Sequence, residues 1–451
     1  MKLHDYQVRA VNFIQHVKPT GTMVAMDLGL GKTAVALSAL SLKNTPALVV
    51  APVQVCWMVW PQEIKKWTPN LSWTVLHGPD KAKKVKLKRD IYICPYSSLA
   101  WLYRQLAEKK CKLPPLSLVL DESSYIKNAS TQRFKMLKKL NILFHNRLKL
   151  CLSASPAPNG LENLWSQYYM LDSGKRLGKY FNRYRDKYFM YTGPPVYKTI
   201  LLKGGQQKIF NKVKDITFRL DNKDYIQLPP IKYNKISLRL PKNLKAKYDE
   251  LEKNFFIELN ETDVEVFNAA ALSMKLRQFL QGAVYTDGEN FEKVHTIKLA
   301  ALKQLLETNA GQPILAAINF KFEYKMIRKR FGNPPIIYGR TPSDEKRRLI
   351  DRWNRGSIPL LLCHPLSVSH GLNLQSGGRT VVWQSLPWSL DQWHQLNGRL
   401  HRQGQKHAVI VNSLVFENTV DEVVEKVLGK KDLTQRTLLN ALREYSRRKL
   451  V

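Results

Sequence analysis

Cysteine is scarce in this chain, and so are acidic residues and long apolar runs. The 451 residues contain five cysteines, none of them in a Cys-x-x-Cys pair. This spacing argues against a disulfide framework or a zinc site and favours a reducing compartment. No stretch approaches the roughly 18 apolar residues that a membrane span needs, and residues 1–6 contain no apolar signal segment. We therefore expect a soluble, cytoplasmic protein with no membrane partner.

Acidic residues number 36, against 72 lysines and arginines, which gives a formal net charge of +36. Such an excess repels itself unless a polyanion relieves it, so nucleic acid is the leading partner. A basic surface that binds nothing specific is the alternative. The cations are clustered, and each cluster can equally be one solvated helix face; the clusters lie at residues 81–89, 133–139, 430–431 and 447–449.

Glycine is used sparingly, yet two glycines fall in one short motif. Residues 27–33 read Asp-Leu-Gly-Leu-Gly-Lys-Thr, between an apolar strand-like run and a helix-like run. Glycine turns let backbone N–H groups face a phosphate, and the helix N-terminus adds its positive end. Met26 stands where the full phosphate-loop pattern has another glycine, so an ordinary turn with Lys32 at the surface is the alternative.

The motif predicts a nucleoside triphosphate site with Mg²⁺ as the second cofactor. Lys32 is expected on the β- and γ-phosphates of ATP, and Thr33 on the metal. The predicted nucleotide-binding residues of this loop are Asp27, Leu28, Gly29, Leu30, Gly31, Lys32 and Thr33.

Two acids follow the apolar run at residues 116–120. Asp121 can bind Mg²⁺ through water, and Glu122 can orient or deprotonate the water that attacks the γ-phosphate. Adjacent acids at a strand end are common turn residues. Placed after a phosphate loop in the same domain, they predict ATP hydrolysis.

Short apolar runs alternate with helical patterns, which is typical of an α/β fold with parallel sheets. In the first part the strand-like runs are 22–25, 47–50, 74–76, 91–94, 116–120 and 148–152. From about residue 161 to 283 aromatic and basic residues crowd together and long helical patterns appear, at 244–259 and 264–280. Strand-like runs return at 314–318, 336–338, 360–363, 380–383 and 409–415, and a last helix is predicted at 433–450.

The second half contributes two arginines. Arg399 and Arg402 are three residues apart, so we expect them on one face of a helix. Aimed across a cleft, they can stabilise charge on the transferring phosphoryl group, an effect of about 10³–10⁵ in rate in other nucleotide hydrolases. A basic helix bound to a phosphate backbone is the alternative for one of the two.

In this order and spacing the motifs resemble the Swi/Snf-like branch of the superfamily-two helicases, especially the compact versions of phages and prophages. The resemblance covers nearly the whole chain and is carried by residues 3–7, 51–67, 91–99, 152–159, 224–230, 298–299, 370–375, 388 and 395–405. It implies two RecA-like lobes in tandem. Lobe 1 is expected at 1–230, with a helical protrusion from about 161, and lobe 2 at 231–451, with a helical insert at about 240–285 and a C-terminal helix.

The same resemblance implies further site residues. Gln7 would contact adenine, with Gly371 and Gln395 as additional nucleotide contacts. The residues implied in nucleic-acid contact are Pro52, Ser97, Asn159, Ser369, Asn373 and Trp388.

Several positions depart from the family pattern. The acid pair continues Ser123-Ser124 where the family has Ala-His, so the usual histidine link to neighbouring motifs is absent, and Ser369 replaces a common glycine. The aromatic and basic residues 180–189 can stack on bases or pack a helical protrusion, and we expect packing. We likewise expect Trp383, Trp388 and Trp393 to serve mainly in packing.

Together these features predict a DNA-dependent ATPase that moves along double-stranded DNA. The alternatives are a helicase that separates or anneals strands on forked or branched DNA, an RNA-directed helicase, and a nucleotide-gated DNA clamp with little turnover. A monomer is compatible with the sequence.

Overall fold

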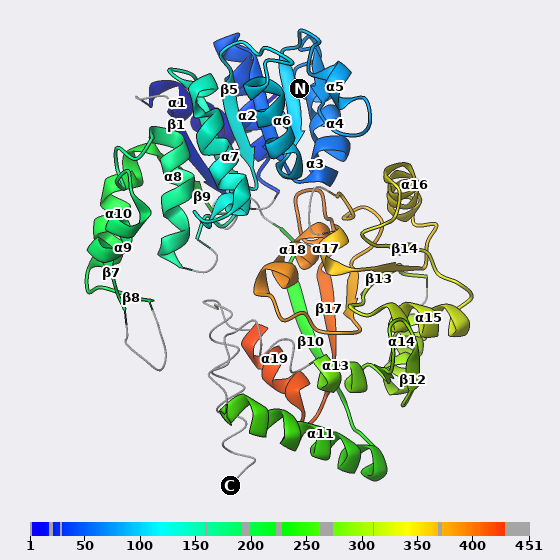
Figure 1. Cartoon of the computed structure of the whole chain (residues 1–451). Helices are drawn as coiled ribbons and strands as arrows, with labels where there is room; N and C mark the ends of the chain where they lie inside the picture. The colour runs from blue at the N-terminus through cyan, green and yellow to red at the C-terminus, as the bar shows by residue number, and fades with distance from the viewer. Residues whose placement is uncertain are drawn as a thin grey trace. The chain divides into compact units, whose positions relative to one another are not determined.

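The structure is a computed structural model that describes residues 2–17, 21–27, 29–157, 160–191, 199–221, 228–261, 274–309, 311–368 and 372–428 (Figure 1). The chain divides into two compact units, residues 1–227 and 228–451. Each unit contains its own parallel sheet with helices, which confirms the predicted fold class.

Among its described residues, unit 1 contains a seven-stranded sheet in the order β3-β4-β2-β5-β6-β1-β9, in which every neighbouring pair is parallel. The strands are β1 (Gly21–Met26), β2 (Ala47–Ala51), β3 (Trp73–Val75), β4 (Ile91–Pro95), β5 (Ser117–Asp121), β6 (Lys149–Ser153) and β9 (Thr217–Leu220). β1, β2, β4, β5 and β6 are buried along their whole length, and such strands appear as continuous apolar runs in a sequence.

Helices cover both faces of this sheet. Side chains alternate along each strand, so Met23 joins one core cluster and Val24 joins the other. The first cluster includes Phe134 and Trp165, and the second includes Leu37 and Trp60. The helices are α1 (Asp5–His16), α2 (Lys32–Lys43), α3 (Val53–Met58), α4 (Trp60–Trp67), α5 (Lys81–Lys84), α6 (Leu99–Ala107), α7 (Gln132–Leu140) and α8 (Leu164–Asp172), with short 3₁₀ turns η1 (Tyr96–Ser98), η2 (Ser123–Ile126), η3 (Asn141–Phe144) and η4 (Leu161–Asn163).

A protrusion leaves the sheet after α8 and returns at β9. It contains α9 (Phe181–Tyr188), the antiparallel strands β7 (Phe189–Tyr191) and β8 (Thr199–Leu201), α10 (Gly205–Val213) and η5 (Lys214–Ile216). Tyr184, Tyr188 and Phe189 are buried in the first core cluster, which confirms packing for these residues. Tyr180, by contrast, is 61% exposed.

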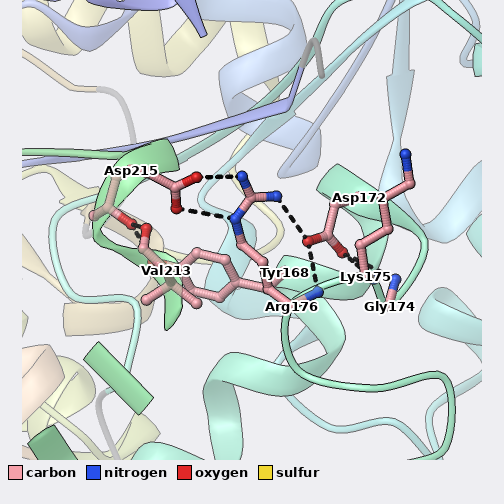
Figure 2. Close-up of polar contacts among 8 residues, drawn as sticks. Tyr168, Asp172, Gly174, Lys175, Arg176, Val213 and Asp215 are labelled. Atoms are coloured by element: carbon pink, nitrogen blue, oxygen red, sulfur yellow. Dashed lines mark hydrogen bonds and ion pairs between the residues drawn. The ribbon is translucent and has the colours of Figure 1, made fainter. Parts of the chain in front are cut away.

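One arginine ties the two ends of this protrusion together (Figure 2). Nη1 of Arg176 donates to Asp172 at the end of α8 (3.2 Å), and its Nε and Nη2 donate to Asp215 in η5 (3.0 Å for Nε). Asp172 also accepts the backbone N–H groups of Gly174 and Lys175. Paired contacts between a guanidinium and a carboxylate are strong and geometrically specific. Arg176 therefore holds the segment that leaves the sheet and the segment that returns to it in a fixed relative position.

Among its described residues, unit 2 contains a six-stranded sheet in the order β10-β17-β16-β13-β15-β14, again with every neighbouring pair parallel. The strands are β10 (Ile231–Leu238), β13 (Ile314–Ala317), β14 (Ile336–Ile337), β15 (Leu360–Cys363), β16 (Thr380–Trp383) and β17 (Val409–Phe416), and a separate hairpin is formed by β11 (Ala283–Tyr285) and β12 (Phe291–Lys293). The helices are α11 (Lys242–Glu261), α13 (Met274–Leu280), α14 (Ile297–Thr308), α15 (Lys321–Arg330), α16 (Ser343–Asn354), α17 (Pro365–Val368), α18 (Leu390–Leu400) and α19 (Val420–Leu428).

Two described strands of the parallel sheets were not predicted from the sequence, and neither were the short antiparallel pairs β7–β8 and β11–β12. β9 and β10 are edge strands of the two sheets, and their residues alternate between apolar and polar types or are largely exposed. The helix expected at 264–280 is described only at 274–280, and the one expected at 433–450 lies outside the described residues. Trp383 and Trp393 stack with ring centroids 4.9 Å apart, as expected of packing residues. Within the described ranges, no helix combines the length and apolar character needed to cross a membrane.

Candidate active site

The turn between β1 and α2 depends on two glycines. Gly29 and Gly31 have φ angles of 89° and 76°, in the left-handed region that favours glycine. A Cβ atom built on Gly31 would lie 2.3 Å from Nε2 of Gln7. Gly31 caps the N-terminus of α2, where the first backbone N–H groups have no partner within the helix. The turn is therefore a cradle that a side chain would fill, and its donors suit a phosphate.

Lys32 opens α2 and lies back over this turn. Its Nζ donates to the carbonyl oxygens of Met26 (2.8 Å) and Asp27 (3.1 Å). Asp27 is itself tied to β9, because its N–H donates to the Leu220 carbonyl (3.1 Å). Thr33 lies in the first turn of α2 and is half-buried. A cation and a hydroxyl thus lie beside the glycine turn, as a phosphate and its metal require.

Gln7 lies on α1 and reaches the same turn. Its Nε2 donates to the carbonyl of Leu30 (3.1 Å), and its Oε1 accepts the N–H of His4 (2.9 Å). The Leu30 side chain is fully buried and anchors the turn in the core. The structure therefore places Gln7 against the phosphate loop, and its contact with adenine stays a prediction.

Asp121 is the last residue of β5 and is only 6% exposed. Its Oδ1 accepts the N–H of Glu122 (3.0 Å), and its Oδ2 accepts Nε1–H of Trp60 (2.9 Å). Burial, reinforced by the neighbouring Glu122 carboxylate, raises the pKa of Asp121 to about 6, while Trp60 and Lys32 act in the opposite direction. A divalent cation would relieve such repulsion, and the Asp121 carboxylate and the Thr33 hydroxyl are oxygen ligands of the kind that Mg²⁺ takes. Their joint binding of the metal stays a prediction.

Glu122 has a left-handed backbone, with φ 51° and ψ 56°. This conformation costs a residue with a side chain roughly 1–2 kcal/mol. It ends β5 abruptly and starts η2. Backbone outliers of this kind cluster at functional sites, where the surrounding contacts enforce them.

Sequence reasoning missed three buried polar contacts around the acid pair. Trp60 contacts the Asp121 side chain, and the hydroxyl of Tyr96 donates to the Asp121 carbonyl (3.0 Å). Ser123 Oγ donates to Oε1 of Gln167 (2.7 Å), and Nε2 of Gln167 donates to the Pro156 carbonyl (2.6 Å). The acid pair is therefore linked to segment 152–156 through a glutamine, although the family's histidine is missing. A buried glutamine in the largely apolar α8 was the only available signal.

In unit 2 the two predicted arginines converge on one atom. Nη1 of Arg399 and Nη1 of Arg402 each donate to the Leu372 carbonyl at 3.4 Å. The prediction that both lie on one helix face is wrong, because α18 ends at Leu400 and Arg402 lies in the turn that follows. The helix ends because the backbone of His401 leaves the helical region (φ −90°, ψ 79°), and Nε2 of Gln405 donates to the Leu400 carbonyl at this end (3.3 Å).

The remaining predicted residues are placed as follows. Gln395 donates from Nε2 to Asp391 (2.9 Å) within α18, and the exposed Asn373 accepts Nδ2–H of Asn354 at its carbonyl (2.9 Å). Trp388 is half-buried, with the guanidinium carbon of Arg277 5.3 Å from its ring centroid. Pro52 is buried at the start of α3, whereas Ser97 is exposed in η1. Leu28, Asn159, Ser369 and Gly371 lie outside the described residues.

Two family models match the chain. The SNF2-related domain matches residues 6–285, which is more than half of the chain, and the helicase conserved C-terminal domain matches residues 297–404. The chain belongs to the SNF2-related family. It is an ATP-dependent enzyme of helicase superfamily two in the Swi/Snf-like branch, which confirms the predicted family and enzyme class.

Individual relatives of this SNF2-related chain include a phage protein. Protein p41 of Acyrthosiphon pisum secondary endosymbiont phage 1 is 31% identical over 97% of this chain and 98% of its own length. A proposed ATP-dependent helicase/translocase, YwqA of Bacillus subtilis, is 24% identical over 95% of this chain, which spans 48%, about half, of that relative. The solved SWI2/SNF2 ATPase core of Sulfolobus solfataricus in complex with dsDNA aligns with 99% of this chain and 95% of its own, at 22% identity and a TM-score of 0.44.

Proposed function

We propose that this SNF2-related chain hydrolyses ATP with Mg²⁺ in order to move along double-stranded DNA. The observation that carries the proposal is a glycine cradle with Lys32 and the acid pair of buried Asp121 and half-buried Glu122, at the carboxyl edge of one parallel sheet. Ligands of such sheets bind at this edge. The formal net charge of +36 supports a polyanion such as DNA as the partner.

Each residue then has a distinct role. Lys32 binds the β- and γ-phosphates, while Thr33 and Asp121 hold the metal, which would neutralise phosphate charge when bound. Glu122 orients the attacking water and accepts its proton. Arg399 and Arg402, from lobe 2, stabilise charge on the transferring phosphoryl group. We assign residues 1–230 and 231–451 as the two motor lobes, so that hydrolysis changes how the lobes engage DNA.

The DNA-facing surface is proposed at α3, α5 and α6. Nζ of Lys81 lies 5.0 Å from the ring centroid of Trp101, and Nζ of Lys84 lies 5.6 Å from that of Trp57. Other lysines of segment 81–89, including Lys83, are exposed. A lysine that packs on an aromatic ring is already partly ordered, so it loses less conformational entropy when it binds a phosphate. Contacts to phosphates position a duplex without selecting a base sequence.

The decisive test is the ATPase rate of the full chain across linear duplex, single-stranded, forked and branched DNA and duplex RNA at one fixed low salt concentration. Stimulation by linear duplex DNA is expected, together with displacement of a third strand from a triplex. The absence of duplex stimulation would contradict the proposal. Unwinding of forks without triplex displacement would favour strand separation, and binding without phosphate release would favour a clamp.

A single substitution tests the chemistry. Glu122→Gln keeps the shape of the side chain but removes the base, so turnover should be abolished while ATP binding remains. Turnover at the wild-type rate would reject the role of Glu122.

A further inference from the structure

Two buried aromatic side chains grip the acid pair from opposite faces of the lobe 1 sheet. Trp60 belongs to the core cluster on one face and donates from Nε1 to Oδ2 of Asp121 (2.9 Å). Tyr96 belongs to the cluster on the other face and donates from its hydroxyl to the carbonyl of Asp121 (3.0 Å). That carbonyl is part of the peptide that leads into Glu122. One bond therefore orients the Asp121 carboxylate, and the other holds the backbone from which Glu122 projects.

Tyr96 also contacts Glu122 indirectly, through Tyr125. Its ring stacks on the ring of Tyr125, with centroids 5.2 Å apart, and the N–H of Tyr125 donates to the Glu122 carbonyl (2.9 Å). The left-handed backbone of Glu122 is thus held before it by the Tyr96 hydroxyl and after it by the backbone of Tyr125, whose ring stacks on Tyr96. These are contacts that can enforce an otherwise unfavourable conformation.

Each aromatic residue belongs to a segment that also reaches the surface. Trp57 precedes Trp60 by three residues, is half-exposed, carries Lys84 over its ring and donates from Nε1 to Nδ1 of His77 (3.3 Å). On the other side, the exposed Ser97 follows Tyr96.

The two segments also leave neighbouring strands. α3 and α4 follow β2, and η1 and α6 follow β4. In the sheet order β4-β2-β5, β2 lies directly beside the strand that ends at Asp121, and β4 is one strand further away. Each segment therefore has an outer part on the surface and an inner donor on the acid pair.

We propose that Trp60 and Tyr96 are positioning residues that couple binding of duplex DNA at α3, α5 and α6 to the arrangement of Asp121 and Glu122. This inference rests on the proposed function. Phosphate contacts on the outer parts fix the two segments, and the two inner hydrogen bonds pass that order to the acids. Both side chains are buried, so neither contacts DNA itself. Their effect is confined to the turnover step.

Matched substitutions in the full chain test the proposal. Trp60→Phe and Tyr96→Phe each remove one donor and leave an aromatic ring in place. The controls are Trp165→Phe and Tyr184→Phe, because both residues are buried in lobe 1 and donate to backbone carbonyls away from the acid pair, Gly178 (3.0 Å) and Leu161 (2.8 Å). ATP turnover is measured with and without saturating duplex DNA, together with KM for ATP and Kd for the duplex.

The expected signature is a split between kcat and the two affinities. Residues that orient a metal-binding carboxylate typically affect activity by about 10–100-fold, so kcat with duplex should fall at least about 10-fold in both test variants. KM for ATP and Kd for the duplex should stay within about twofold, because the phosphate loop and the basic surface are unchanged. Both control variants should keep the wild-type stimulation, even where their thermal stability drops.

Failures of the two proposals can be told apart. If duplex DNA does not stimulate the wild-type chain, the proposed function fails. If the wild type is stimulated and the test variants are stimulated as strongly as the controls, the coupling is overturned while the function stands. Should Trp60→Phe not fold, Tyr96→Phe decides alone, since it removes one oxygen from a ring that keeps its stack on Tyr125.

Discussion

Units 1 and 2 both place a helix directly after a buried parallel strand, yet they treat the helix N-terminus in opposite ways. In unit 1, β1 leads through the glycine turn to α2, whose first turn contains Lys32 and Thr33 and no acid. In unit 2, β13 leads through Ile318-Asn319-Phe320 to α15. There, Oε2 of Glu323 accepts the N–H groups of Asn319 (2.9 Å) and Phe320 (2.8 Å).

The difference shows what turns a common structural unit into a site. The positive end of a helix attracts an anion in either case. Unit 2 supplies the acceptor from its own first turn, the carboxyl group of Glu323, and so forms a closed joint. Unit 1 supplies glycines and a cation instead, and leaves the position of the anion to a ligand. Even the first helical residue matches, because α2 begins at Lys32 and α15 at Lys321.

The largest difference should appear when the two matching lysines are exchanged for alanine. Lys32→Ala removes the charge beside the phosphates and should lower ATP turnover by at least about 100-fold. Lys321 forms an exposed ion pair with Glu289, so Lys321→Ala should leave turnover within about twofold. Steady-state phosphate release by the two variants checks this. Equal losses in both would show that the lysines do not differ as described.

A smaller effect is expected from adding one methyl group to the glycine turn. Gly31→Ala combines a strained left-handed φ with a Cβ 2.3 Å from Nε2 of Gln7, so the Gln7 side chain must move away from the phosphate loop and ATP affinity should fall about 10-fold. Gly332 in unit 2 also has a positive φ of 66° but has nothing within 4 Å of its built Cβ. Gly332→Ala should therefore reduce stability by about 1 kcal/mol without changing ATP affinity. ATP titration and thermal unfolding of both variants separate a steric effect from a purely conformational one.

The smallest effect on turnover is expected at Glu323, where the readout is stability. Burial raises the pKa of Glu323 to about 7, above its usual 4.5. Between these values the folded state binds more protons than the unfolded state, so the free energy of unfolding should fall as pH rises, by about 3 kcal/mol in total. Glu323→Gln should remove this dependence, because an amide oxygen can still accept the two N–H groups.

Denaturant unfolding of the wild type and of Glu323→Gln at pH 5 and pH 8 measures the effect. ATP turnover at one pH serves as the control and should be unchanged, since Glu323 lies in the closed joint of unit 2. An equal slope of stability against pH in both proteins would show that Glu323 does not titrate in this range.

Local patterns were enough to predict the buried strands and the glycine turn. β2 and β5 are continuous apolar runs because helices cover both faces of their sheet. The Gly-x-Gly-Lys-Thr pattern predicts the turn because its two glycines allow the left-handed backbone that the turn needs. β9 and β10 lack that signal, since only Leu220 of β9 is buried and β10 is largely exposed.

Contacts between segments far apart in the chain could not be predicted. The Trp60 and Asp121 partners are 61 residues apart, and Ser123 and Gln167 are 44 apart, so no periodicity connects them. The position of Arg402 was missed for a related reason: α18 ends at Leu400, whose carbonyl accepts a hydrogen bond from the side chain of Gln405 instead of continuing the helix. A spacing of three residues alone does not report such a cap.

The pairing of β1 has a consequence for the order of events during synthesis. This strand, at residues 21–26, pairs with residues 149–153 and 217–220. The glycine turn that follows it is therefore synthesised long before the strands that hold it in place. A nascent chain that stops short of residue 220 has the whole glycine motif but lacks the carbonyl that anchors Asp27. Because Arg176 joins the two ends of the protrusion just before β9 (Figure 2), we expect the protrusion to mature before the chain becomes competent for ATP.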